Sequence, residues 1–138
     1  MKPEAIFGPV GVLAVWTGVV LFLTGFTRLL AVRRGRVGRG AFRLGESKEV
    51  PDDVAVVNRN LMNLLEMPVL FYVACLSIYV THHVTSGVLR LAWIYVGLRL
   101  LHSLIHLTRN IVVYRLLVFA LSNVVLVTIW IWFIRRVL

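Results

Sequence analysis

The sequence predicts an all-α integral membrane protein in which four transmembrane helices form one bundle. Apolar residues make up 59% of the 138-residue chain, and its mean hydropathy of +0.87 is far outside the range of soluble globular proteins. Four apolar stretches alternate with short polar segments, and each is long enough for the roughly 20 helical residues that crossing a bilayer requires. This length leaves room for one domain, so we expect a single four-helix unit over residues 1–138.

We expect spans at about residues 5–32, 54–81, 88–111 and 114–135. The first is free of charge as far as Thr27 and is followed by arginines rather than by a small-residue cleavage site. We therefore expect it to stay in the protein instead of acting as a signal peptide. The last ends in aromatic residues followed by Arg135 and Arg136, which is the order of an aromatic belt and snorkelling cations at a membrane surface.

The segment 33–53, between the first two spans, is rich in arginine and glycine and predicts a water-exposed loop. The positive-inside rule assigns this loop to the cytoplasm, so we expect a multi-pass membrane protein with both termini outside. The net charge of +9 is concentrated between spans rather than along a recognition helix, which argues against nucleic-acid binding. Orientation and phospholipid contact explain the charge of the loop, and a protein-docking site is the alternative.

Polar side chains at the start of the second span form a stripe on one face. Arg59, Asn63 and Glu66 stand at i, i+4 and i+7, so they share one side of a helix. Charged groups within a span cost about 3 kcal/mol each on insertion scales, and they normally face a bundle interior or an aqueous cavity. The stripe therefore predicts a functional cleft.

The third span carries a second stripe. Its polar residues are Arg99, His102, His106, Arg109 and Asn110. His102, His106 and Asn110 fall on one face of a continuous helix, with Arg99 close by. Both stripes lie toward the same end of the bundle, as do Arg28 and Arg115, so we expect them to meet in one cavity. A purely structural polar seam is the alternative.

A metal site is a further hypothesis for these residues. His102 and His106 have the i, i+4 spacing of a chelating pair, and Glu66 could supply a third ligand. The nearby positive charges of Arg99 and Arg115 disfavour a cation there. We therefore expect no metal ligands in this chain.

The motifs of the two stripes resemble those of the MAPEG family, the membrane-associated proteins of eicosanoid and glutathione metabolism. The resemblance covers the whole chain, and it is strongest in Arg59-x3-Asn63-x2-Glu66 followed by Pro68, and in Arg99-x2-His102 followed by Arg115. It points to a bacterial branch of the family. It implies a homotrimer with active sites between subunits, in contact with membrane lipids.

The resemblance also implies a ligand and a role for each residue. Glutathione is the expected co-substrate, and Arg115 is the expected catalytic residue because it would stabilise the thiolate. The implied glutathione-binding residues are Arg28, Arg59, Asn63, Glu66, Arg99, His102 and His106. We therefore expect a glutathione-dependent transferase or peroxidase that acts on a lipophilic small molecule. A non-catalytic lipid- or amphiphile-binding protein that uses the same intersubunit cleft is the alternative.

Three positions depart from the pattern of the eicosanoid-metabolising members. His106 and Phe119 stand where those members have tyrosine, and Met62 stands where they have a second arginine. The loss of tyrosine favours the lipid-binding alternative. The charge pattern still suits glutathione, which carries two carboxylates and an ammonium group, because the expected cleft contains several arginines and Glu66.

Overall fold

The computed structural model describes residues 2–43 and 49–138, and this part of the chain is helical with no strand. Its elements are η1 (Pro3–Ile6), α1 (Phe7–Arg33), η2 (Arg39–Phe42), α2 (Asp52–Val80), α3 (Ser86–Leu107) and α4 (Val112–Val137). The shortest of the four α-helices has 22 residues, which at 1.5 Å per residue is about 33 Å and so exceeds a hydrocarbon core of about 30 Å. All four are long and apolar enough to cross a membrane, which confirms the predicted fold class.

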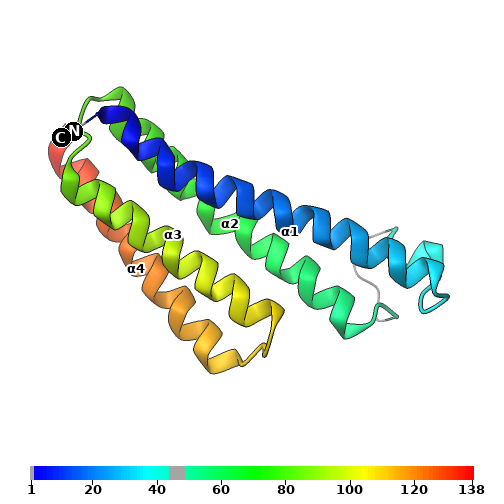
Figure 1. Ribbon diagram of the computed structural model, residues 1–138. Helices are drawn as coiled ribbons and strands as arrows, with labels where there is room; N and C mark the ends of the chain where they lie inside the picture. The colour runs from blue at the N-terminus through cyan, green and yellow to red at the C-terminus, as the bar shows by residue number, and fades with distance from the viewer. Residues whose placement is uncertain (1, 44–48) are drawn as a thin grey trace.

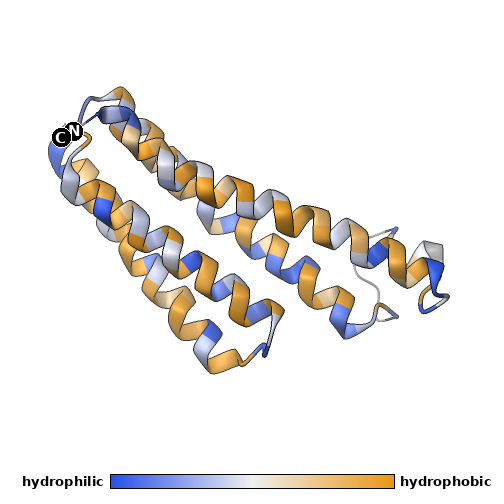
Figure 2. Ribbon diagram, in the orientation of Figure 1, coloured by the Kyte–Doolittle hydropathy of each residue, from blue (hydrophilic) through white to orange (hydrophobic). Residues whose placement is uncertain are grey.

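The four helices pack as two antiparallel pairs, α1 with α2 and α3 with α4. Figure 1 shows both chain termini at one end of the bundle and the α1–α2 and α3–α4 connections toward the other. The two pairs diverge toward that second end. In Figure 2 hydrophobic ribbon covers most of each helix, while hydrophilic positions recur on α2 and α3 in the half nearer the connections. The polar stripes therefore lie where the two pairs separate.

The apolar core lies between the helices in the half nearer the termini. Phe71 of α2 stacks on Tyr95 of α3 with ring centroids 4.5 Å apart, and both side chains are fully buried together with Leu13 of α1. α2 continues through Pro68 without interruption. Burial of these large side chains holds α1, α2 and α3 together, whereas α4 contributes only Ser122, Leu126 and Ile129 as buried residues.

A buried polar link joins three helices in the middle of the bundle. The indole Nε1 of Trp16 donates to Ser103 Oγ at 2.8 Å, and the amide Nδ2 of Asn60 donates to the same oxygen at 2.7 Å. One hydroxyl on α3 thus accepts hydrogen bonds from α1 and from α2. Such interhelical bonds fix the register of helices whose remaining contacts are apolar and weakly directional.

The described part of the expected loop is mostly exposed, and some of its apolar side chains pack on the helices. Val37, Ala41 and Val50 are buried against the end of α1 and the start of α2. α1 ends at Arg33, and Gly35, two residues further on, has a φ of +66° that suits a glycine just after a helix C-terminus. Arg36 binds both carboxylate oxygens of Asp53 at 2.9 Å, and this contact raises the pKa of the arginine. Residues 44–48 of the expected loop lie outside the described residues.

The third helix ends four residues earlier than expected, at Leu107 rather than at 111. Asn110 has a left-handed backbone with φ of +48°, and its N–H donates to the carbonyl of Ile105 at 2.8 Å, a type of bond that closes helix C-termini. Arg109 and Asn110 therefore belong to the α3–α4 turn and not to the face of α3. The predicted one-helix stripe is wrong at these two residues.

Candidate functional site

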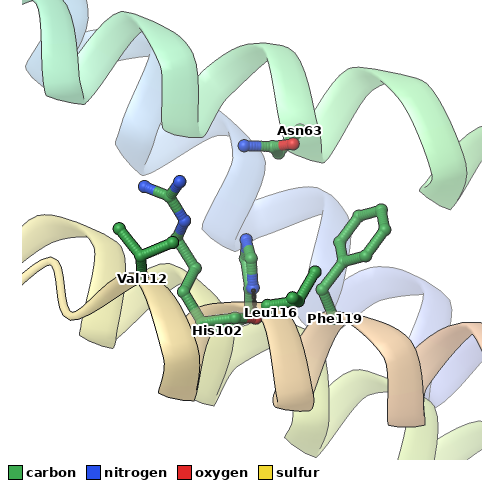
Figure 3. A pocket seen from close by; sticks show the side chains of 6 residues that line it. Asn63, His102, Val112, Leu116 and Phe119 are labelled. Carbon is green, nitrogen blue, oxygen red and sulfur yellow. Dashed lines mark hydrogen bonds between the residues drawn. The ribbon is translucent and has the colours of Figure 1, made fainter.

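A cavity of about 210 Å³ lies between α2 and the α3–α4 pair, and we call it the α2–α4 cavity. Its lining residues are Asn63, His102, Val112, Arg115, Leu116 and Phe119. Figure 3 shows His102 between Val112 and Phe119, with its ring directed from α3 toward Asn63 on α2. One wall is therefore polar and comes from α2 and α3, and the other is largely apolar and comes from the first turns of α4.

His102 is held in one tautomer by the main chain of α4. Its Nδ1 lies 3.0 Å from the carbonyl oxygen of Arg115. A carbonyl oxygen can only accept, so Nδ1 carries the hydrogen and Nε2 of the neutral ring carries the lone pair. Among the residues that the structure describes, Nε2 has no hydrogen-bond partner, and it is sheltered from bulk water. The ring also lies against Phe119, with centroids 5.6 Å apart.

Arg115, in the first turn of α4, forms hydrogen bonds with two uncharged side chains. Its Nη1 donates to Asn110 Oδ1 at 2.6 Å and to His106 Nε2 at 3.2 Å. In the described part of the chain, no carboxylate lies within ion-pair distance of this guanidinium. The positive charge of Arg115 is therefore uncompensated in the protomer. Asn110 reaches Arg115 from the α3–α4 turn, where its backbone is left-handed.

Arg99 is buried behind the cavity and does not line it. Its side chain is fully buried: Nε donates to the hydroxyl of Tyr95 at 3.0 Å, and Nη2 donates to Asn123 Oδ1 at 3.0 Å. The guanidinium lies between the rings of Tyr95 and Phe119, 5.3 and 5.0 Å from their centroids. Phe119 therefore separates Arg99 from the cavity, and the contacts of this arginine are those of a core residue.

The polar stripe of α2 meets the cavity at one residue. Asn63 lines it and donates from Nδ2 to the main-chain carbonyl of Arg59 at 3.0 Å. Arg59 and Glu66 are exposed on the protomer. Arg59 lies close enough to His106 for its charge to act on that ring. The protomer thus leaves two charged side chains of α2 on the surface of a membrane-spanning helix.

Arg28 lines a separate cavity at the end of α1, together with Leu29, Val32, Arg33 and Phe42. Its Nη2 donates to Asn58 Oδ1 at 2.7 Å, and its guanidinium lies 5.2 Å from the centroid of Phe42. Within one protomer, the structure does not bring Arg28 to the α2–α4 cavity.

Sequence reasoning missed several residues that position the site. Asn123, the amide partner of Arg99, is a polar residue within the long charge-free stretch of the last span, and that exception was a usable signal. Ser103 follows His102 directly, and its position on the inner face of α3 could have indicated a contact between helices. Asn58 precedes the stripe of α2, and its link to α1 leaves no sequence signal.

The cavity combines one cation with groups that can form hydrogen bonds. Arg115 supplies a fixed positive charge, His102 supplies an open lone pair, and the amide of Asn63 supplies a neutral hydrogen-bonding group. Over residues 2–43 and 49–138, no three His, Cys, Asp or Glu side chains are grouped so that they could hold a metal ion. His102 and His106 have ring centroids 6.0 Å apart, and each already has a nitrogen bonded to Arg115.

The fold and this cavity define a multi-pass integral membrane protein with a cationic site among its helices. The chain matches the model of the MAPEG family over residues 6–135 and belongs to that family. Membership confirms the family that the motifs of the two stripes indicated, and it associates the chain with glutathione-related transferases, peroxidases and related proteins. No curated protein and no solved structure gives a significant match to the chain.

Proposed function

We propose that the protein is a glutathione-dependent transferase or peroxidase that acts on lipophilic electrophiles, with Arg115 stabilising the glutathione thiolate. The observation that carries this proposal is the guanidinium of Arg115 beside the α2–α4 cavity, with neutral partners at 2.6 and 3.2 Å and no carboxylate among the described residues to compensate it. A thiolate bound in the cavity would supply the missing negative charge.

The chemical gain can be estimated from the thiol. A thiol with a pKa near 8.5 is only a few per cent ionised at neutral pH, and a fixed positive charge nearby lowers such a pKa by about one or two units. The reactive fraction then rises about tenfold. Arg115 retains its charge throughout the physiological pH range, so this gain does not depend on its own protonation.

We propose a homotrimer, as the family resemblance implies, and two observations support a site that is completed by a neighbouring copy of the chain. Cavities that bind small molecules typically have volumes of about 300–1,000 Å³, and the α2–α4 cavity of one protomer has about 210 Å³. Arg59 and Glu66 are exposed on a membrane-spanning helix, where charged groups are costly unless they are covered or solvated. We propose that a neighbouring protomer covers this stripe and contributes its Arg28 to the glutathione carboxylates.

A lipophilic substrate could enter from the bilayer. Val112 and Leu116 line the cavity, yet they are 62% and 63% exposed on the outer side of α4. The apolar wall of the cavity is thus continuous with the surface that lipid chains contact. The electrophile would approach from this side, and glutathione would approach from the polar side at α2.

A non-catalytic lipid-binding protein is the second candidate. The observation that favours it is the apolar wall formed by Phe119, Leu116 and Val112. The ring of Phe119 offers no hydroxyl to a bound thiol, and His106 already accepts a hydrogen bond from Arg115. In this case Arg115 would bind a lipid headgroup.

Measuring the binding of glutathione to the detergent-solubilised protein distinguishes the glutathione-dependent enzyme from the lipid-binding protein. We expect binding by the parent and a loss of about tenfold or more in affinity for Arg59→Ala, because a charge-assisted hydrogen bond is worth about 1.5–3 kcal/mol. Arg109→Ala is the matched control, since Arg109 is exposed on the α3–α4 turn and does not line the cavity. The parent should also conjugate an aromatic halide or reduce a lipid hydroperoxide. Lipid binding without glutathione binding or turnover would favour the second candidate.

We further propose that the protein lies in a bacterial inner membrane with the α1–α2 loop in the cytoplasm and both termini outside. The support is the cluster of exposed arginines at that end, which includes Arg33, Arg34, Arg36 and Arg43. The orientation can be tested with two variants that lack the native cysteine (Cys75→Ala) and carry one new cysteine, Arg43→Cys or Lys2→Cys. Each variant is placed in sealed inverted vesicles and treated with a thiol reagent that does not cross the membrane. Labelling at Arg43 from the cytoplasmic face is the expected result.

A further inference from the structure

The Nε2 atom of His102 is the feature of the site that the proposed function does not yet use. It is buried without a hydrogen-bond partner, and its ring lines the α2–α4 cavity beside Arg115. Buried polar atoms without partners are uncommon and call for an explanation. A ligand that donates a hydrogen bond within the cavity would satisfy this one.

The two cavity histidines differ in what their ring nitrogens can do. His106 Nε2 accepts a hydrogen bond from the guanidinium of Arg115, so its lone pair is occupied. His102 uses its Nδ1–H on the main-chain carbonyl of Arg115, so its lone pair on Nε2 stays open. Of these two rings, His102 is therefore the one that can take a proton from a ligand.

We propose that His102 Nε2 accepts the proton of the thiol that binds against Arg115. This role rests on the proposed function and adds to it a general base. The sulfur would lie between the guanidinium and the imidazole, which both line the cavity. Arg115 would stabilise the negative charge that forms, and the Arg115 carbonyl bonded to Nδ1–H would stabilise the imidazolium, because that bond strengthens when the ring becomes charged.

The step balances for an aromatic halide. The S–H bond breaks and its proton moves to His102 Nε2, which leaves an imidazolium and a thiolate. The thiolate forms a bond to the ring carbon, and the carbon–halogen bond breaks as the halide leaves with its electron pair. The imidazolium then loses its proton to water, so one thiol and one aryl halide give one thioether, one halide ion and one proton.

The pH dependence of the rate tests this role. The charged and titratable groups around His102 are Arg99 and His106 on its own helix and Arg115 on α4, with Arg59 of α2 beside His106. The arginines stay charged across the accessible pH range, so the two histidines and the thiol are the groups that titrate. Comparing His102→Gln with the matched variant His106→Gln separates the two histidines.

We expect His102→Gln to lower kcat/KM for the aromatic halide about tenfold at pH 5.5, where a thiol whose pKa Arg115 has lowered by one or two units is still mostly protonated and needs a base. The deficit should shrink to within about twofold above about pH 8.5, where the thiol bound against Arg115 is ionised without a base. The deficit of His106→Gln should be the same at both pH values. A His102→Gln rate within threefold of the parent at pH 5.5, or an equal deficit at both pH values, would overturn the role.

A second measurement uses only the parent protein. Ultraviolet absorbance measures how much thiolate forms when glutathione binds. A pH indicator in weak buffer measures how many protons are released at the same time. S-methylglutathione, which has no thiol proton, is the control for protons that come from other groups. Thiolate formation with less than one proton released per thiolate is expected, because His102 retains part of it. One proton per thiolate would overturn the role. A parent that neither binds nor turns over glutathione would instead overturn the proposed function and, with it, this inference.

Discussion

Arg99 and Arg115 are two arginines of neighbouring helices that occupy opposite environments. Arg99 is fully buried and lies between two aromatic rings, with Tyr95 and Asn123 as hydrogen-bond partners. Arg115 lines a cavity and has a histidine and an asparagine as partners. Phe119 lies between the two regions, since it contacts Arg99 and lines the cavity. Two arginines of equal charge in the sequence thus occupy a buried position and a cavity-lining position.

The largest expected effect comes from removing the cavity-lining arginine. Arg115→Ala should lower kcat of glutathione conjugation by about 10² to 10³, because the loss of one preorganised charge costs about 2.7–4 kcal/mol in the transition state. The effect on glutathione affinity should be much smaller, since the interaction strengthens as the thiolate forms. Steady-state kinetics of the parent and the variant measure both. A fall in affinity with an unchanged kcat would place Arg115 in ground-state binding only.

Removing the buried arginine should affect stability more than catalysis. Arg99→Met should destabilise the protein by about 1–3 kcal/mol, because the hydroxyl of Tyr95 and the amide oxygen of Asn123 lose their partner inside the bundle. The rate per folded protein should stay close to that of the parent. Thermal unfolding in detergent and kinetics on the folded fraction measure the two effects.

A combined variant sharpens this prediction. Replacement of every partner by an apolar group of similar shape can be nearly neutral, so Arg99→Met with Tyr95→Phe and Asn123→Leu should recover most of the lost stability. If the triple variant were no more stable than the single one, the contacts of Arg99 would not be the cause of the loss.

A smaller effect is expected at the buried polar link. Ser103→Ala removes the common acceptor of Trp16 and Asn60, and interhelical hydrogen bonds in membrane proteins average about 0.6 kcal/mol with a maximum near 1.7. We expect a loss of about 1 kcal/mol, measured by unfolding in a graded detergent mixture. Ser122→Ala is a comparison within α4, because its hydroxyl bonds to its own helix at Phe119, and it should have less effect.

The smallest effect is expected at the loop. Arg36→Ala removes an ion pair with Asp53 whose side chains are 43% and 63% exposed, and exposed pairs contribute little because water and salt screen them. The melting temperature should stay within measurement error of the parent at physiological salt. A clear decrease would show that the packed loop depends on this pair.

The sequence predicted the membrane class, the four helices and the family because these depend on long apolar stretches and on motifs with fixed spacing. It did not predict where α3 ends, because that end depends on the left-handed backbone of Asn110, which a continuous periodicity conceals. It grouped Arg99 with Arg115 because spacing indicates a shared side of a helix but not depth. The separation depends on Phe119 and Asn123, which come from another helix and are recognisable only once α3 and α4 are packed together.

The main chain of Arg115 contacts His102, and its side chain contacts His106 and Asn110. Substitution of the residue removes the side-chain contacts but leaves the main-chain carbonyl in place. A library that varies only this side chain would therefore alter the charge offered to a ligand while the imidazole keeps its orientation. If the proposed function holds, position 115 is accordingly the position at which the charge presented to a bound ligand can be changed without disturbing His102.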